Sequence, residues 1–202
     1  MVTSLVVDEP RGEHTSAAVT DQKAALEKLV WHQLRSVKDP EIPVLDVVEM
    51  GIARAVEVAL DSSSQHPSDP PTWRVRVTIT PTFSACPALH AIERDVRETT
   101  ERTLTGFSGS DGAGQVEVVT TLTPPWTSDD MSAEAREKLE RFGIAPAPPH
   151  GGLLLPALEA PVRCPRCGHP DTRVRNTFGS TLCREIRSCN SCQETFERFK
   201  PI

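Results

Sequence analysis

The stretch CPRCGHPDTRVRNTFGSTLCREIRSCNSC, residues 164–192, contains five of the six cysteines of this 202-residue chain. Its two C-x-x-C pairs are separated by the 21 residues between Cys167 and Cys189. Each pair can form a tight knuckle, and two knuckles at the ends of a β-hairpin complete a tetrahedral four-sulfur shell that suits zinc. The separation is just beyond the usual range of about 15–20 residues. We therefore predict a C-terminal zinc ribbon over residues 162–202, with a structural zinc bound by Cys164, Cys167, Cys189 and Cys192.

Other uses of these cysteines are less compatible with the sequence. The first 20 residues lack the basic and apolar regions of a secretory signal, so we expect a cytoplasmic protein whose thiols stay reduced rather than a disulfide framework. Neither C-x-x-C pair opens a helix after a strand, which disfavours a redox pair. A rubredoxin-like iron or a cluster stays open as an alternative to zinc. Since a unit of ~40 residues has little core, the metal is expected to supply its stability.

Cys183 lies between the two pairs and exceeds what four-coordination needs. It is either a small residue in the second strand of the ribbon hairpin, or an extra thiol that is exposed or binds a metal. Gly168 follows the first knuckle, where a left-handed backbone conformation is often required.

The charge of the chain is unevenly distributed. Residues 161–202 carry eight basic and four acidic side chains, a net charge of +4, whereas the other 160 residues carry 14 and 24, a net charge of −10. The ribbon is therefore either docked on the acidic part or free to bind an acidic partner. A nucleic-acid-binding or protein-binding ribbon is the alternative function, with Phe178, Phe196 and Phe199 available for stacking on bases. The zinc-bound thiolates and the acidic body argue against nucleic acid.

The rest of the chain predicts a small α+β domain with the order α-β-β-α-β-α and helices on one face of the sheet. We expect a disordered tail over residues 1–19, this domain over residues 20–143, and a stiff Pro-rich linker over residues 144–161. Helix patterns begin at Thr20, after Cys86 and at residue 129, and the strands alternate over residues 51–60, 73–80 and 115–122. No run approaches the ~18 apolar residues of a membrane helix, so no membrane partner is expected.

The sixth cysteine, Cys86, lies in TPTFSACPAL, residues 80–89. Pro87 can occupy the first turn of the next helix. A thiol there faces unpaired N–H groups and the positive end of the helix dipole, so we expect a lowered thiol pKa and an accessible sulfur. The alternative is a buried structural cysteine. A thiol enzyme would need a nearby base, and His90 lies over the next helical turn instead.

Two sets of motifs resemble known families. DPEIPVLDVVEMGI, residues 39–52, together with TPTFSACPAL resembles the SufT-like domain of iron–sulfur cluster assembly. TPPWTSDDMSAEAREKLERFGIAPAPP, residues 123–149, and the ribbon motifs are similar to the PaaD (or PaaJ) family of phenylacetyl-CoA epoxidase subunits.

The resemblance implies an accessory subunit of a multicomponent monooxygenase that is not catalytic alone. In that family the di-iron centre and the reductase sit on other subunits, and this one helps assemble or insert an iron or iron–sulfur centre. By motif match, the transfer residues would be Asp39, Glu41 and Cys86. Whether Cys86 holds a cluster, a single iron or nothing stays open, and the expected partners are the oxygenase or reductase subunits. Cys183 falls in the FGST-x-C stretch of the family.

Overall fold

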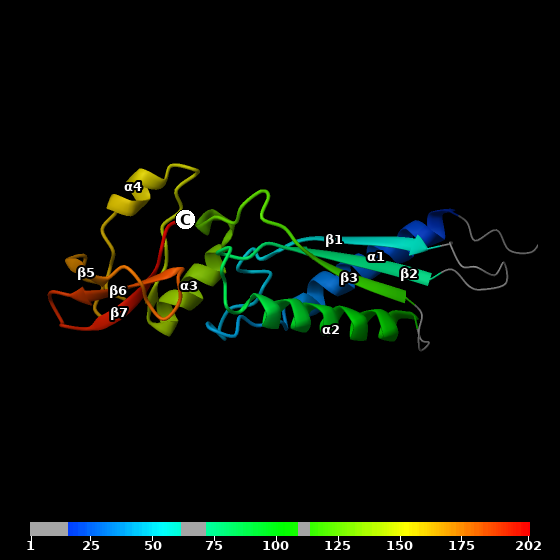
Figure 1. The fold of residues 1–202 in the computed structure, drawn as a ribbon, viewed down its shortest axis with the longest axis horizontal. Coiled ribbons are helices and arrows are strands. Elements are labelled where there is room, and N and C mark those ends of the chain that lie inside the picture. The colour runs from blue at the N-terminus through cyan, green and yellow to red at the C-terminus, as the bar shows by residue number, and fades with distance from the viewer. Residues whose placement is uncertain (1–15, 62–71, 109–113) are drawn as a thin grey trace, which may run out of the picture.

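The computed structural model describes residues 16–61, 72–108 and 114–202 (Figure 1). Its two sheets have the strand orders β1-β2-β3 and β4-β7-β6-β5. The elements in chain order are α1 (Ser16–Leu34), β1 (Ala53–Asp61), β2 (Thr72–Ile79), α2 (Leu89–Ser108), β3 (Gly114–Thr120), the 3-10 turn η1 (Ser128–Asp130), α3 (Ala133–Phe142), β4 (Ile144–Ala145), α4 (Leu154–Glu159), β5 (Thr172–Asn176), β6 (Arg184–Cys189) and β7 (Thr195–Phe199).

The first sheet confirms the predicted α+β domain. β1 pairs antiparallel with β2, and β2 pairs parallel with β3 through the crossover helix α2. Side chains of β2 alternate between the core and the solvent: Val75 and Val77 are fully buried, whereas Arg74 and Arg76 are exposed. This alternation follows from the two-residue period of a strand with one covered face. The sheet, α1 and α2 lie at one end of the molecule, and the ribbon lies at the other (Figure 1).

The predicted helix boundaries need correction. α1 begins at Ser16 rather than at Thr20, so the last residues of the expected disordered tail are helical; residues 1–15 lie outside the described part. Most of the predicted connection 61–72 lies outside it too. The predicted helix from residue 129 is first a 3-10 turn, and α3 starts only after Ser132, whose Oγ accepts the N–H of Ala135 at 3.0 Å. Gly143 ends α3 with φ of 91°, as its left-handed tolerance allows.

The ribbon has more strands than the predicted hairpin. β5 and β6 form that hairpin, β7 pairs antiparallel with β6, and β4 pairs parallel with β7. The segment 144–161, which we expected to be a linker, therefore supplies a strand to the ribbon sheet and the short helix α4. None of the helices in the described ranges is long and apolar enough to cross a membrane.

The C-terminal end of the ribbon is packed into the first domain. Phe199 is fully buried in the main core, and its ring lies 5.7 Å from that of Trp126 at a tilt of 53°. The indole N–H of Trp126 donates to the carbonyl of Met50 at 2.8 Å. The N–H of Ser128 donates to the carbonyl of Ile202 at 3.1 Å. The basic ribbon is thus docked on the acidic domain, which decides between the two interpretations of the charge asymmetry.

Candidate metal sites

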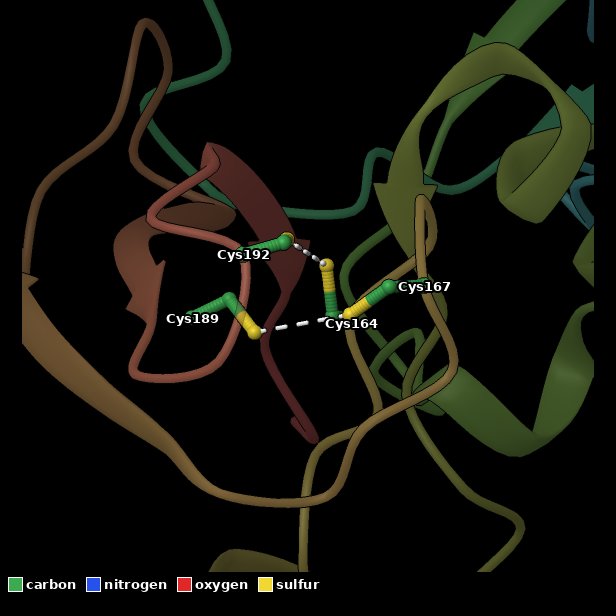
Figure 2. A group of neighbouring side chains, drawn as sticks. All are labelled: Cys164, Cys167, Cys189 and Cys192. Atoms are coloured by element: carbon green, nitrogen blue, oxygen red, sulfur yellow. Dashed lines mark hydrogen bonds between the residues drawn. The ribbon is translucent and has the colours of Figure 1, made fainter.

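The four predicted ribbon ligands converge. Cys164 and Cys167 come from one knuckle, Cys189 and Cys192 from the other, and their sulfurs face one another (Figure 2). All four ligand atoms lie within 4.8 Å of one another, and no other group of three or more potential ligands in the described part of the chain is gathered so closely. All six cysteines are free thiols.

The two knuckles have the same backbone geometry. The carbonyl of Cys164 accepts the N–H of Gly168 at 2.8 Å, and that of Cys189 accepts the N–H of Gln193 at 3.1 Å. Both donor residues have a left-handed backbone conformation, with φ of 72° at Gly168 and 63° at Gln193. The sequence indicates the first position by its glycine, whereas the second is filled by a glutamine at a modest conformational cost.

The sulfur positions fit a tetrahedral ion. The Sγ atoms of Cys164 and Cys192 are 3.7 Å apart, and those of Cys167 and Cys189 are 3.6 Å apart. A tetrahedral ion with metal–sulfur bonds of about 2.3 Å places its ligands about 3.8 Å from one another. The donor set is therefore shaped to hold one metal ion, and it sits in a unit too small to have a large core of its own.

The thiols of this group have unequal pKa values. Backbone N–H groups of Cys192 and Ser191 lower the pKa of Cys189 to about 7. The N–H of His169 lowers the pKa of Cys167, but hydrogen bonds shared with neighbouring thiols and burial raise it to about 12. Four thiols this close cannot all ionise without a cation between them.

The second candidate site is a pocket between the domains, with a cavity of about 20 Å³. Three separate stretches line it, and each contains a predicted site residue: Asp39 and Glu41 in the first, Cys86 in the second and Cys183 in the third. Met50 and Phe199 complete the lining. Asp39, Glu41 and Cys86, which the sequence only associated by motif, are therefore neighbours, and the ribbon brings Cys183 to them.

Cys86 lies in a turn before α2, and this helix begins at Leu89 rather than directly after Cys86 as predicted. Its N–H donates to the carbonyl of Phe83 at 3.0 Å, and its carbonyl accepts the N–H of Leu89 at 3.2 Å. Our prediction of a lowered thiol pKa was wrong. Burial raises the pKa of Cys86, although the N–H groups of Ala88 and Leu89 favour the thiolate. The thiol is half-buried, so it is less accessible than expected.

Asp39 is buried, with 6% of its surface exposed. Its Oδ1 accepts the N–H groups of Glu41 and Ile42, both at 2.8 Å. These hydrogen bonds stabilise the turn that contains Pro40. Its Oδ2 has no hydrogen-bond partner within the described ranges. Burial raises the pKa of this carboxyl group, and the two backbone N–H groups oppose the rise.

Glu41 lies at the edge of the pocket and is the more exposed of the two acids. Its Oε2 is 3.9 Å from a guanidinium nitrogen of Arg184, the residue after Cys183. Arg184 is buried and also pairs with Glu197 at 2.6 Å. An ion pair thus joins the DPE stretch to the ribbon at the pocket.

Cys183 precedes β6 rather than lying inside it. Its Sγ is 3.1 Å from the hydroxyl of Thr181, and its carbonyl accepts the N–H of Lys200 at 2.9 Å. Burial raises the pKa of this thiol as well. Sequence reasoning could not place Cys183 and Phe199 at the pocket, or Arg184 beside Glu41, because no spacing within the chain reports how the domains dock.

Several residues that we considered for nucleic-acid binding or for thiol catalysis are buried or lie away from the pocket. Of the three aromatic rings considered for stacking, Phe196 and Phe199 are buried, and Phe178 lies 5.2 Å from the ammonium of Lys200. Arg184 and Arg198, two of the basic residues, are buried and paired with acids. His90 has 95% of its side chain exposed and lies beside Glu93, so it does not line the pocket.

Comparison with known families matches two separate parts of the chain. Residues 27–110 match the family described as iron-sulfur cluster assembly protein, and residues 152–200 match the PaaD zinc beta ribbon domain. The chain thus combines an iron–sulfur-assembly type of domain with a zinc ribbon. It is 37% identical over 173 residues to an Escherichia coli (strain K12) protein named as a subunit of the 1,2-phenylacetyl-CoA epoxidase, covering 86% of this chain and 92% of that one. The chain belongs to the PaaD family of these epoxidase subunits, which confirms the resemblance.

Two solved structures are similar to part of this chain. A domain of unknown function, DUF59, from Bacillus anthracis is 24% identical with a TM-score of 0.44, over 59% of this chain and 96% of that one. Rv1466 from Mycobacterium tuberculosis, described as associated with Fe–S complex assembly and repair, is 24% identical with a TM-score of 0.31, over 67% of this chain and 98% of that one.

Proposed function

We propose that this chain is the accessory subunit of the phenylacetyl-CoA 1,2-epoxidase system in aerobic phenylacetate degradation. In this role it assembles or inserts an iron or iron–sulfur centre of the oxygenase or reductase subunits and is not catalytic alone. Membership of the PaaD family and the assembly-type domain support the role. The single observation that carries it is the pocket in which Cys86 meets Asp39.

The pocket suits temporary binding of iron. A thiol and a carboxylate are both ligands for ferrous iron, and a site that keeps open coordination positions can pass its ion to an acceptor. Their pKa values are raised by burial, so both groups carry a proton more readily than in water. Iron binding then displaces the thiol proton, and release of iron to the acceptor allows the proton to return.

We propose zinc as the resident ion of the four-cysteine group. Its sulfur separations of 3.6 and 3.7 Å support a tetrahedral ion, and zinc has no redox chemistry of its own. Cys164, Cys167, Cys189 and Cys192 would hold it, and it would stabilise the ribbon without taking part in transfer.

Replacing Cys86 tests the function directly. We expect Cys86→Ser to fold and to retain its zinc, because the sulfur-to-oxygen change affects a half-buried side chain in the other domain. The variant should fail to activate the epoxidase when it replaces the wild-type chain in cells or in a mixture of the purified subunits. The measurements are ring epoxidation of phenylacetyl-CoA and the iron content of the recipient subunits.

Ser84→Ala is the matched control, since Ser84 is exposed in the same loop but does not line the pocket. It should activate the epoxidase as the wild type does. Full ring epoxidation with Cys86→Ser would mean that Cys86 is a packing residue and that the proposed transfer role is wrong.

A further inference from the structure

We propose that Cys183 is a second thiolate ligand of the pocket, so that Cys86, Cys183 and Asp39 together bind one divalent metal ion, ferrous iron, across the two domains. This inference rests on the proposed function and deepens it: it adds a ligand from the ribbon, and it identifies the cargo as a single ion rather than a preformed cluster.

Cys86, Cys183 and Asp39 converge on one cavity from distant stretches of the chain. Cys86 precedes α2 of the first domain and Cys183 precedes β6 of the ribbon, yet both line the same cavity with Asp39. The cavity thus gathers two thiols and a carboxylate from three stretches that are distant in the sequence, and these are ligand types that a divalent transition-metal ion accepts. The charge of Asp39 contributes, after burial, to the raised pKa of both Cys86 and Cys183, which shows that the three groups are close.

Asp39 has a carboxylate oxygen that is free to bind a metal ion. Asp39 is only 6% exposed, and its Oδ1 is held by two backbone N–H groups. Its Oδ2 has no hydrogen-bond partner among the residues the structure describes. A carboxylate on a side chain this little exposed has lost most of its hydration, and a cation bound at the free Oδ2 would compensate for that loss.

The volume of the cavity limits what it can hold. A cavity needs about 10–15 Å³ to hold one water molecule, so the observed 20 Å³ accommodates one ion and little else. A cluster of several irons and sulfides is larger than this cavity. The dimensions therefore favour a mononuclear site.

The ligands are not yet arranged as they are in the ribbon. Only the four ribbon cysteines, within the described part of the chain, bring their ligand atoms within 4.8 Å of one another. At least one of the three side chains must therefore rotate to bind an ion. Binding exchanges the two thiol protons for Fe²⁺ without a change of oxidation state, and the third ligand is the carboxylate. A site of three ligands that must rearrange suits an ion that is later given up.

The test is metal titration of the full-length, zinc-loaded protein under anaerobic conditions, with Fe²⁺ and with Co²⁺ as the spectroscopic probe. The wild type should bind one ion beyond zinc and develop a thiolate-to-cobalt charge-transfer band. Cys86→Ser and Cys183→Ser should each lose about half of this band and bind at least about tenfold more weakly. Asp39→Asn should bind at least about tenfold more weakly but keep the full band at saturation, since both thiolates remain.

Ser180→Ala is the matched control, because Ser180 lies near Cys183 but outside the pocket lining. It should titrate as the wild type does. Zinc content after each titration verifies that the ribbon site has not exchanged its metal. A second measurement needs no substitution: in the wild type, Fe²⁺ or Co²⁺ should protect both Cys86 and Cys183 from iodoacetamide, as counted by mass spectrometry.

The outcomes separate the inference from the proposed function. If Cys183→Ser titrates as the wild type does while Cys86→Ser loses the band, or if metal protects Cys86 alone, Cys183 is not a ligand and the inference is wrong, with the proposed function intact. If the zinc-loaded wild type binds no additional ion and neither thiol is protected, both the inference and the single-ion form of the proposed function are wrong.

Discussion

The two cysteine sites of this chain differ in how they are built. The ribbon site takes all four ligands from one small domain. Two of its sulfur pairs already stand at 3.6 and 3.7 Å, close to the spacing around a tetrahedral ion, and all four sulfurs lie within 4.8 Å of one another. The pocket takes its thiols from two domains and its carboxylate from a turn, and these groups are not gathered as tightly. The first arrangement fits a metal that stays bound, and the second fits the transfer role that we propose for the pocket.

The difference also predicts that the two sites depend on each other in one direction only. The ribbon knuckles are fixed by their own backbone hydrogen bonds and left-handed residues. The pocket exists only while the ribbon is docked, because Cys183 and Phe199 reach it from the ribbon side. Loss of the resident metal should therefore destroy both sites, whereas changes at the interface or in the pocket should spare the resident metal.

The largest effect is expected from Cys189→Ser. It removes a buried ligand, and because metal binding and folding are coupled in such small units, the ribbon should lose several kcal/mol of stability. Phe199 would then leave its contact with Trp126, so tryptophan emission should shift to longer wavelength. Zinc content, circular dichroism and fluorescence of the purified variant are the measurements.

Chelation of the metal from the wild type should reproduce the same changes and be reversed by added zinc. A folded, docked ribbon that contains less than one metal ion per chain would contradict the prediction that the metal stabilises this unit.

Much of the fold could be predicted from the sequence, because its local signals agree with the final packing. The alternation in β2, the spacing of the knuckles, Gly143 and Gly168 all report short-range geometry. The helix start at Thr20 was wrong because apolar periodicity does not reveal how far a polar first turn extends. The strand β4 was missed because a two-residue strand has no periodicity and forms only when β7 is beside it.

A smaller but still large effect is expected from Phe199→Ala. Phe199 is fully buried at the junction of the domains, and removal of a buried phenyl ring typically costs about 3–5 kcal/mol. The docked arrangement should loosen, and the pocket should lose one wall, while the knuckles keep their metal. Urea unfolding followed by tryptophan fluorescence, together with zinc content, measures both parts.

Phe178→Ala is the matched control, since Phe178 is 58% exposed and its ring lies against the ammonium of Lys200. This substitution should lower the free energy of unfolding by no more than about 1 kcal/mol. Loss of zinc from Phe199→Ala would show that the ribbon cannot fold without its partner domain, and the one-directional dependence would be wrong.

The two candidate sites could be predicted to different degrees, because one lies within a short stretch of chain and the other is assembled from distant stretches. The four ribbon ligands follow from spacing, because all of them lie within one short stretch of chain. Asp39, Glu41 and Cys86 could be associated only through a family resemblance, and the fold brings them together. The position of Cys183 opposite Cys86 and the raised pKa of Cys86 depend on domain docking and burial, which leave no mark in the local sequence.

The smallest effect is expected from Glu41→Gln, which removes one half of the ion pair across the pocket. Glu41 is 44% exposed and its Oε2 lies 3.9 Å from Arg184, so the solvent screens the attraction, and such pairs contribute about 0–1 kcal/mol. Arg184 is not left unpaired, because Glu197 remains at 2.6 Å. Urea unfolding should show a loss of stability of at most about 1 kcal/mol, and this loss should shrink as the salt concentration is raised.

Glu57→Gln is the matched control, since Glu57 forms an exposed pair with Arg76 at 3.7 Å on the sheet, away from the pocket, and should behave similarly. A loss of several kcal/mol that does not depend on salt would show that Glu41, rather than Phe199 and its core contacts, holds the two domains together.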